Sequence, residues 1–379
     1  MENLSTEIGD GIHATPIYDD NGTYYFVNGN NISEHGITIT PTTQRVTEAE
    51  AYRNNATILC SETILLSING TIGNVALYKG EPIMLGKSAC YINVSSKVNR
   101  HYIFHYLMMP KCQFYFTSEL TGTTIKNLSL KSVRKTKVSL PNMEEQNRIA
   151  QLFDAINKRI ATQNKIIDKL QSLIKGLNDF LYTQYGGEVL TSFAELGTSY
   201  SGLSGKSAQD FGSGKPFITY LNVYSNNVIK ENDFQYVAIK DDEKQNVVKY
   251  GDVLFTLSSE TPEEVGVGSV YLGKEKVYLN SFCFGIHITN TEVAFPPYLS
   301  YYVSLTAFRK FIYPYAQGST RFNLCKADFE KASIKLPTLA DQKRIYSVLG
   351  HIDCKIETER QMLNLYNSQK QYLLRQMFI

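Results

Sequence analysis

One segment of the chain occurs twice, and this repeat constrains the fold more than any other feature of the sequence. LPNMEEQNRIAQLF begins at Leu140 and LPTLADQKRIYSVL begins at Leu336, an offset of 196 residues. At the same offset, GTTIKNLSLKSVRKTKVSLP from Gly122 aligns without a gap with GSTRFNLCKADFEKASIKLP from Gly318. Weaker similarity extends upstream, where YIFHYL matches YLSYYV, TILLSI matches DVLFTL and EIGDG matches ELGTS. Because such a repeat indicates duplicated folding units, the 379 residues are predicted to form two copies of one unit.

Each copy is predicted to contain a β-rich domain followed by one long helix. The first part of each copy shows strand-like alternation and turn sequences such as NGT, NGN and SING, typical of a mixed α/β (α+β) domain with long surface loops. The helices start just after the Leu-Pro pairs, where Asn142 with Glu145 and Thr338 with Asp341 predict capping boxes. The Gly-Gly pair at 186–187 ends the first helix. The predicted parts are a domain over 1–140, a helix over 141–186, a domain over 187–336 and a helix over 337–379.

Apolar residues recur in both helices with the 3-4 spacing of a coiled-coil seam. Gln163 and Glu359 occupy equivalent seam positions near the midpoints of the two helices. If they pair, neither polar group is buried without a partner, which would cost about 1 to 3 kcal/mol. A parallel pair would also align them, but two copies in one chain related by a pseudo-twofold axis favour an antiparallel coiled coil with a domain at each end, a dumb-bell. The alternative is an amphipathic helix lying on each domain. The seams are Ile149, Phe153, Ile156, Ile160, Gln163, Ile167, Leu170, Ile174, Leu177 and Leu181, and Ile345, Leu349, Ile352, Ile356, Glu359, Leu363, Tyr366, Lys370, Leu373 and Met377.

Composition limits the classes of function. With 43% hydrophobic residues, 20% charged residues and a net charge of +2, the chain is an ordinary globular protein whose charge neither indicates nor excludes nucleic acid. The polar N-terminal segment and the short apolar runs predict a cytoplasmic protein without membrane association.

The six cysteines form no CxxC pair, which favours free thiols over disulfides or zinc. His101 and His105, one helical turn apart without a third ligand nearby, favour a plain helix face over a metal site.

Several segments resemble the specificity subunit of type I restriction-modification systems. They are the duplicated LPxxxxQxRI helix starts after G[TS]T..NL, IGDGIHATPIYDDNGTYYFVNGNNI in the first domain, and FITYLNVYSNNVI and SSETPEEVG in the second. The resemblance covers essentially the whole chain. It implies two target-recognition domains, each reading one half of a bipartite, asymmetric DNA sequence, spaced by the two helices. Because the chain begins almost at the first recognition domain, any N-terminal helical docking element is expected to be reduced.

The resemblance also implies the partners. Besides double-stranded DNA, these are two modification (methyltransferase) subunits, which dock on the helices, carry S-adenosylmethionine and methylate adenine. Restriction subunits, which are ATP-dependent translocases and endonucleases, join that core. The chain itself is then a non-catalytic subunit with no cofactor and no metal.

Loop residues of both domains are candidates for base contact, because base reading needs amide and hydroxyl groups whereas Arg and Lys fix phosphates. The alternative for the Asn-Gly clusters is a plain turn. The candidates are Asn28, Asn30, Asn31, Asn69 and Thr71 in the first domain, and Tyr220, Asn222, Ser258, Ser259 and Glu260 in the second.

A repeated loop is the candidate for phosphate contact. The first copy, from Leu120 to Met143, contains five basic residues and no acid. Small hydroxyl residues beside glycine let the backbone approach a phosphate, and the basic residues supply charge. The alternative is that the glycines only turn the chain and the lysines face solvent. The candidates are Thr123, Thr124 and Lys126 in the first copy and Ser319, Thr320 and Arg321 in the second, of which Lys126 and Arg321 are favoured.

Three fragments resemble enzyme motifs without meeting their requirements. FPPY from Phe295 lacks the Asn of an adenine methyltransferase motif and is better explained as a helix start with proline in the first turn. GLSGKS has too few residues between its glycines for a phosphate-binding loop, and FGSGK lacks the spacing of a methyl-donor site. No nucleophile-base pair recurs with the repeat, so catalysis is not expected. Two alternatives stay open: a specificity subunit of a related system with fused methylation and cleavage, and a coiled-coil scaffold that binds protein or carbohydrate.

Overall fold

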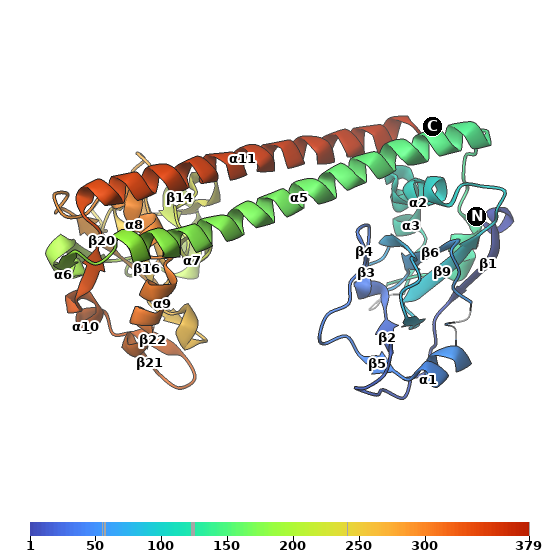
Figure 1. Ribbon diagram of the computed structural model, residues 1–379, viewed down its shortest axis with the longest axis horizontal. Coiled ribbons are helices and arrows are strands. Elements are labelled where there is room, and N and C mark those ends of the chain that lie inside the picture. Colours follow the sequence, from blue (N-terminus) through green and yellow to red (C-terminus); the bar gives the residue numbers. More distant parts are fainter. Residues whose placement is uncertain (55, 57, 123–125, 241, 379) are drawn as a thin grey trace. The chain divides into compact units, whose positions relative to one another are not determined.

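The computed structural model describes residues 1–379 except 55, 57, 123–125, 241 and 379. The chain divides into two compact units, the first formed by 1–165 with 360–379 and the second by 166–359. Each unit is a mixed α/β structure that contains a β-rich domain and parts of both long helices (Figure 1). Each long helix contributes to both compact units, and the division into four parts stays a prediction.

Both units contain the same four-stranded antiparallel sheet. The strand order is β1-β9-β6-β7 in the first unit and β13-β20-β16-β18 in the second. Matched by their place in the repeat, the strands occur in the same order, which confirms the predicted duplication. The bounds are β1 Ser5–Asp10, β6 Thr63–Ser67, β7 Val75–Leu77 and β9 Ala89–Val94, and β13 Gly197–Ser201, β16 Val253–Thr256, β18 Gly268–Val270 and β20 Cys283–Ile288.

Smaller sheets are duplicated as well. The order β5-β2-β8 in the first unit corresponds to β15-β14-β19 in the second, and in both the central strand pairs in parallel with the last. The short hairpin β10-β11 corresponds to β21-β22, which is extended by β17. The bounds are β2 Tyr24–Val27, β5 Arg45–Val46, β8 Ile83–Leu85, β10 Leu120–Thr121, β11 Asn127–Leu128, β14 Phe211–Ile218, β15 Gln235–Val237, β17 Ser258–Ser259, β19 Tyr278–Leu279, β21 Ala316–Gln317 and β22 Phe322–Leu324. The other strands are β3 Ile32–Ser33, β4 Gly36–Ile37, β12 Val189–Thr191 and β23 Ile334–Leu336.

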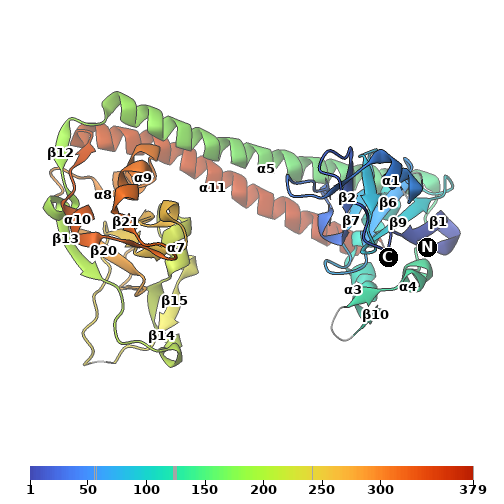
Figure 2. The same cartoon turned by 90° about the horizontal axis from the view of Figure 1, so that it is seen from below.

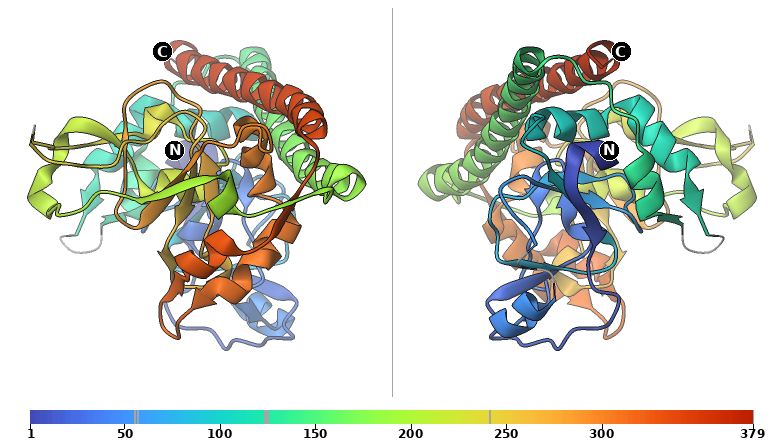
Figure 3. Two further views of the ribbon diagram at one scale, coloured as in Figure 1. Left: turned by 90° about the vertical axis from the view of Figure 1, so that its left-hand side faces the viewer. Right: turned by 90° about the vertical axis from the view of Figure 1, so that its right-hand side faces the viewer.

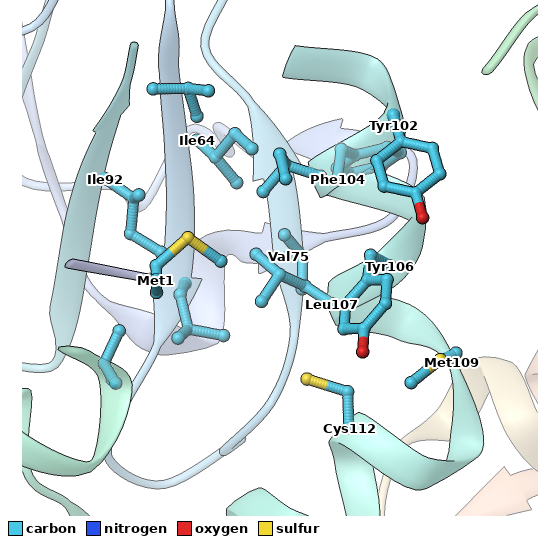
Figure 4. Packing of buried hydrophobic residues seen from close by; sticks show 14 of the residues in the cluster. Met1, Ile64, Val75, Ile92, Tyr102, Phe104, Tyr106, Leu107, Met109 and Cys112 are labelled. Atoms are coloured by element: carbon cyan, nitrogen blue, oxygen red, sulfur yellow. The ribbon is translucent and has the colours of Figure 1, made fainter. Parts of the chain in front are cut away.

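Short helices pack on the four-stranded sheet to form the core of each unit. In the first unit, side chains of α2 face Ile64, Val75 and Ile92 of three neighbouring strands (Figure 4). Strand β6 is buried at every position, which explains its continuous apolar run. In the second unit α8 begins with Pro296 and Pro297, as predicted for FPPY. The bounds are α1 Glu48–Arg53, α2 Arg100–Met108, α3 Pro110–Ser118, α4 Leu130–Lys135, α6 Phe193–Leu196, α7 Tyr220–Ser225, α8 Pro296–Tyr302, α9 Thr306–Ile312 and α10 Lys326–Lys331.

The two long helices, α5 Met143–Tyr185 and α11 Leu339–Gln376, start at the predicted caps. The Asn142 side-chain oxygen accepts a hydrogen bond from the Glu145 N–H at 2.9 Å, and the Thr338 hydroxyl oxygen accepts one from the Asp341 N–H at 3.2 Å. The first helix ends at Tyr185, and Gly187, two residues further on, has a φ of +98° that favours glycine.

The parts of α5 and α11 within one unit run antiparallel. In the first unit the Phe153 ring stacks on Phe378 with 5.5 Å between centroids, and the Arg159 Nε donates to the Tyr366 hydroxyl at 2.9 Å. A later residue of α5, Arg159, contacts an earlier residue of the C-terminal segment, Tyr366. The two chain directions are therefore opposite. Figure 3 views the two long helices from their ends, with α5 in green and α11 in red.

Every residue of the two predicted seams is buried or partly buried. Gln163 and Glu359 are both buried, and their mutual contact stays a prediction. Lys370, another polar seam position, forms an ion pair with Glu34 beside the β3-β4 hairpin. In the described part of the chain, no helix has the length and apolar character of a membrane span.

Candidate nucleic-acid interface

In both units the repeated glycine loop meets a second loop that contains candidate residues. In the second unit Ser258 pairs with Asn323 where β17 adjoins β22. In the first unit Asn69 forms the corresponding bridge with Asn127, which occupies the same place in the repeat as Asn323. Two loops that are distant in sequence are therefore brought together twice, in the same register.

A third candidate segment joins this meeting point in each unit. In the first unit the Thr71 hydroxyl donates to the Gly29 carbonyl oxygen at 2.7 Å. In the second unit the Tyr220 hydroxyl, on α7, donates to the Ser258 carbonyl oxygen at 2.9 Å. Figure 2 shows α7 on the same side of the second unit as β21. Three candidate segments of each unit thus meet at one place.

The asparagines of VNGNN divide into two groups. Asn28 and Asn31 hold a turn: the Asn28 N–H donates to the Asn31 side-chain oxygen at 3.0 Å, and the Ser88 hydroxyl donates to the Asn28 side-chain oxygen at 2.9 Å. Asn30 is exposed, as is Thr71, whereas Asn69 is partly buried. Asn30 and Thr71 are therefore the more accessible candidates in these two loops of the first unit.

The basic loop of the first unit is described only in part, because Thr123 and Thr124 lie outside the described residues. Gly122, just before them, has a φ of +97°, so the glycine is needed for the backbone path. Lys126 is exposed. Arg134, by contrast, donates to the Ile8 carbonyl oxygen at 2.6 Å and secures strand β1. The other basic residues of the loop, Lys131, Lys135 and Lys137, are exposed.

The second unit has a cavity of about 370 Å³ at the meeting point of its three segments. The rings of Tyr220 and Tyr224 stack on one another with 6.0 Å between centroids and an interplanar angle of 14°. Aromatic and charged side chains therefore share a single concave site. Its lining includes Tyr220, Tyr224, Ser259, Glu260, Phe282 and Arg321.

One wall of this cavity is held by Glu264. Its two carboxylate oxygens accept hydrogen bonds from Tyr224 at 2.7 Å and from Ser259 at 2.8 Å. These two hydrogen bonds hold the pKa of Glu264 below its ordinary value. Arg309, on α9, donates to the carbonyl oxygens of Glu263, Val265 and Gly266 and so fixes the same loop. The wall is consequently preorganised.

The repeated glycine loop of the second unit forms the other side of the cavity. A side chain at Gly318 would meet the Arg321 carbonyl oxygen at 2.1 Å, so the turn requires glycine. Ser319, Thr320 and Arg321 are exposed at this turn. The Arg321 guanidinium carbon lies 5.6 Å from the Phe282 ring centroid, a cation–π contact.

Asn222 lies below the surface instead of in the cavity. It is 2% exposed, and its side chain exchanges two hydrogen bonds with the Lys230 backbone, at 2.8 and 3.1 Å. Its amide therefore closes the loop that follows α7. Because the partner of Asn222 is a backbone eight residues away, no local sequence pattern distinguishes this buried asparagine from an exposed one.

Sequence reasoning missed Tyr224, Glu264, Phe282 and Arg309 as parts of this site. The spacing of Tyr220 and Tyr224 on YLNVY is a usable signal, because residues four apart share a helix face. Phe282 and Arg309 gave no such signal. Phe282 lines the cavity from the turn before β20, and Arg309 supports the loop around Glu264 from α9, and both are distant in sequence from the candidate loops.

Comparison with known proteins identifies this arrangement. The profile of the type I restriction modification DNA specificity domain matches residues 12–172 and 196–365. The chain belongs to this family, as a specificity subunit with two recognition domains. Each match begins in one β-rich domain and continues into the long helix that follows it.

Relatives and solved structures agree with the family. MjaX of Methanocaldococcus jannaschii, named as a type I restriction enzyme specificity subunit, is 27% identical over 324 residues, which cover 76% of this chain and 70% of the relative. The crystal structure of a type I restriction-modification S subunit from M. genitalium shares the fold at a TM-score of 0.55 and 13% identity, covering 100% of this chain and 94% of that one. A chain from work on complex assembly and conformational transition of the type I R-M system gives a TM-score of 0.58 at 15% identity, with 99% and 98% covered.

Proposed function

We propose that the chain directs a type I restriction-modification complex to DNA, and that each recognition domain reads one half of a bipartite, asymmetric sequence. The observation that carries this proposal is the same three-segment meeting point in both units, built with different side chains. The first unit presents Asn30, Thr71 and Lys126, whereas the second presents Glu260 and Arg321 beside two tyrosines. A shared scaffold with different side chains supports two different half-sites.

The chain is proposed to be non-catalytic and to act with partners. Two modification subunits supply S-adenosylmethionine and the methyl transfer, and restriction subunits supply the ATP-dependent activity. A second apolar stripe on α5 supports docking: Ile166, Leu173 and Phe180 recur every seven residues on one face of the helix within the second unit. Leu173 is 52% and Phe180 57% exposed. Exposed apolar residues that share one helix face are a feature of protein interfaces, which supports this stripe as the docking surface.

Purified full-length chain, alone and with its modification subunit, tests the proposal. We expect DNA binding that weakens steeply with salt, because lysine and arginine contacts release counterions. We also expect adenine methylation only when the modification subunit and S-adenosylmethionine are both added. Binding insensitive to salt would favour a scaffold that binds protein or carbohydrate, and methylation by the chain alone would contradict the non-catalytic role.

A further inference from the structure

An acid and a base lie just beyond the end of two paired strands, at the cavity of the second unit. Ser259 pairs with Phe322 in the antiparallel ladder between β17 and β22. Glu260 directly follows Ser259 and Arg321 directly precedes Phe322, so both charged residues adjoin the last pair of the ladder. Both are exposed, and both line the cavity of about 370 Å³. Because both side chains line the same cavity, the two charged groups can serve one ligand surface.

Neither charged group is neutralised by a partner within the described residues. The Arg321 guanidinium rests on the Phe282 ring, and within the described residues neither Arg321 nor Glu260 forms an ion pair. The neighbouring carboxylate, Glu264, already accepts hydrogen bonds from Tyr224 and Ser259 with both oxygens. Glu260 is thus the cavity carboxylate with no internal hydrogen bond in the described structure.

The pair of groups matches one kind of base pair. In the major groove guanine presents two acceptors, O6 and N7, that fit the fork of an arginine, and cytosine presents the N4 amino donor that a carboxylate accepts. An A·T pair fits less well in either orientation: one sets the thymine O4 acceptor or methyl group against the carboxylate, and the other offers the arginine fork only the single O4 acceptor of thymine. A phosphate at this place would be repelled by Glu260, which argues against Arg321 as a simple phosphate contact.

We infer that the second recognition domain reads a G·C base pair, with Arg321 on guanine and Glu260 on cytosine. This inference rests on the proposed function and names part of the half-site. The position equivalent to Glu260 in the first unit is Thr71, which has no charge. The same meeting point therefore makes no such acid and base pair in the first unit, and the reading of G·C at this place belongs to one half of the target.

Selection of bound duplexes from a randomised DNA library, followed by sequencing, tests the inference on the full-length chain with its modification subunit. Wild-type protein should enrich a two-part sequence with G·C at one position of one half. Arg321→Gln, Arg321→Lys and Glu260→Gln should each lower the preference for G·C at that position by roughly 10-fold to 100-fold, with the other half unchanged. Arg344→Lys is the matched control, because Arg344 is also exposed and also lies over an aromatic ring, that of Tyr185, at 5.5 Å.

The outcomes that overturn the inference are distinct from those that overturn the proposed function. If both Arg321 variants keep the wild-type sequence preference, or weaken all sequences equally and reduce the salt dependence, Arg321 contacts phosphate and the inference is wrong. If the half-site altered by exchanging the second domain contains no G·C pair, the inference is also wrong. If wild-type protein enriches no sequence at all, the proposed function fails and the inference fails with it. Arg321 and Glu260 are exposed, so unchanged thermal midpoints of their variants verify folding.

Discussion

The side-chain oxygen of Gln146 accepts a hydrogen bond from the backbone N–H of Asn99 at 2.9 Å. The Gln146 amide also donates to the Pro141 carbonyl oxygen at 2.9 Å, so one side chain joins the start of α2 to the entrance of α5. Gln342 repeats the arrangement in the second unit, accepting from the Phe295 N–H at 2.8 Å. The duplicated Leu-Pro and Gln of the sequence are therefore parts of one joint between a recognition domain and its helix.

Gln146→Ala should destabilise the first unit by about 1 to 3 kcal/mol, because Gln146 is buried and its loss leaves backbone groups without partners. Urea unfolding followed by circular dichroism measures the change. Gln151→Ala is the control, since Gln151 is exposed on the same helix, and its effect should stay within about 0.5 kcal/mol. Equal effects of the two substitutions would show that the joint adds nothing to stability.

The helix starts and seams could be predicted from the sequence because their determinants are local. Asn142 caps a helix three residues away, and seam positions repeat with a fixed period. The joint and the cavity could not be predicted, because Gln146 reaches residue 99 and Arg309 reaches the loop around Glu263 only after folding. Lys370 shows the same limit: its seam position was clear, but its ion pair with Glu34 depends on a hairpin at the other end of the sequence.

The first unit should lose stability as pH falls below about 6.5, the ordinary pKa of histidine. Burial lowers the pKa of His105 although its hydrogen bond to Asp154 opposes this, and Lys370 and His101 lower it further. Below the ordinary histidine pKa the unfolded chain binds a proton at His105, whereas the folded unit resists protonation. The stabilisation is therefore present above the ordinary pKa and is lost as pH falls below it.

Asp154 extends the same loss to lower pH. Partial burial alone would raise the pKa of Asp154, but hydrogen bonds from His101 and His105 outweigh it and hold the pKa well below its ordinary value.

Urea unfolding at pH 7 and pH 5.5 should show the loss of stability in wild-type protein and a smaller loss in His105→Gln. His351→Gln, at an exposed histidine, should keep the wild-type pH dependence. The role assigned to His105 is wrong if both variants retain the full loss.

Leu173→Glu or Phe180→Glu should weaken association with the modification subunit by at least about 10-fold, because a charge then replaces exposed apolar surface on α5. The thermal midpoint should change little, since both side chains are more than half exposed. Sedimentation of mixtures of the two subunits measures the affinity. Lys175→Glu, at an exposed position outside the stripe, is the matched control and should leave association intact.

Exchanging residues 1–140 for the first recognition domain of another specificity subunit should alter one half of the methylated sequence and leave the other half unchanged. The reason is that the candidate contacts of each half lie within one unit, around one meeting point. Methylome sequencing of cells that carry the exchanged chain gives the result directly. A change in both halves would refute independent reading.

The heptad seams lead to a prediction about the distance between the half-sites. One heptad added to each helix, next to Gln163 in α5 and next to Glu359 in α11, preserves the seam pattern and adds roughly 10 Å to each helix. That length corresponds to about three base pairs, but three base pairs also rotate the second half-site by roughly 100° around the duplex, and the protein or the DNA must absorb this rotation. If the helices measure the distance, the lengthened chain should therefore recognise the same bases in both halves across a longer nonspecific spacer, with weaker binding. Methylome sequencing with the lengthened chain reads the spacer. An unchanged spacer would mean that the distance is set by something other than these helices.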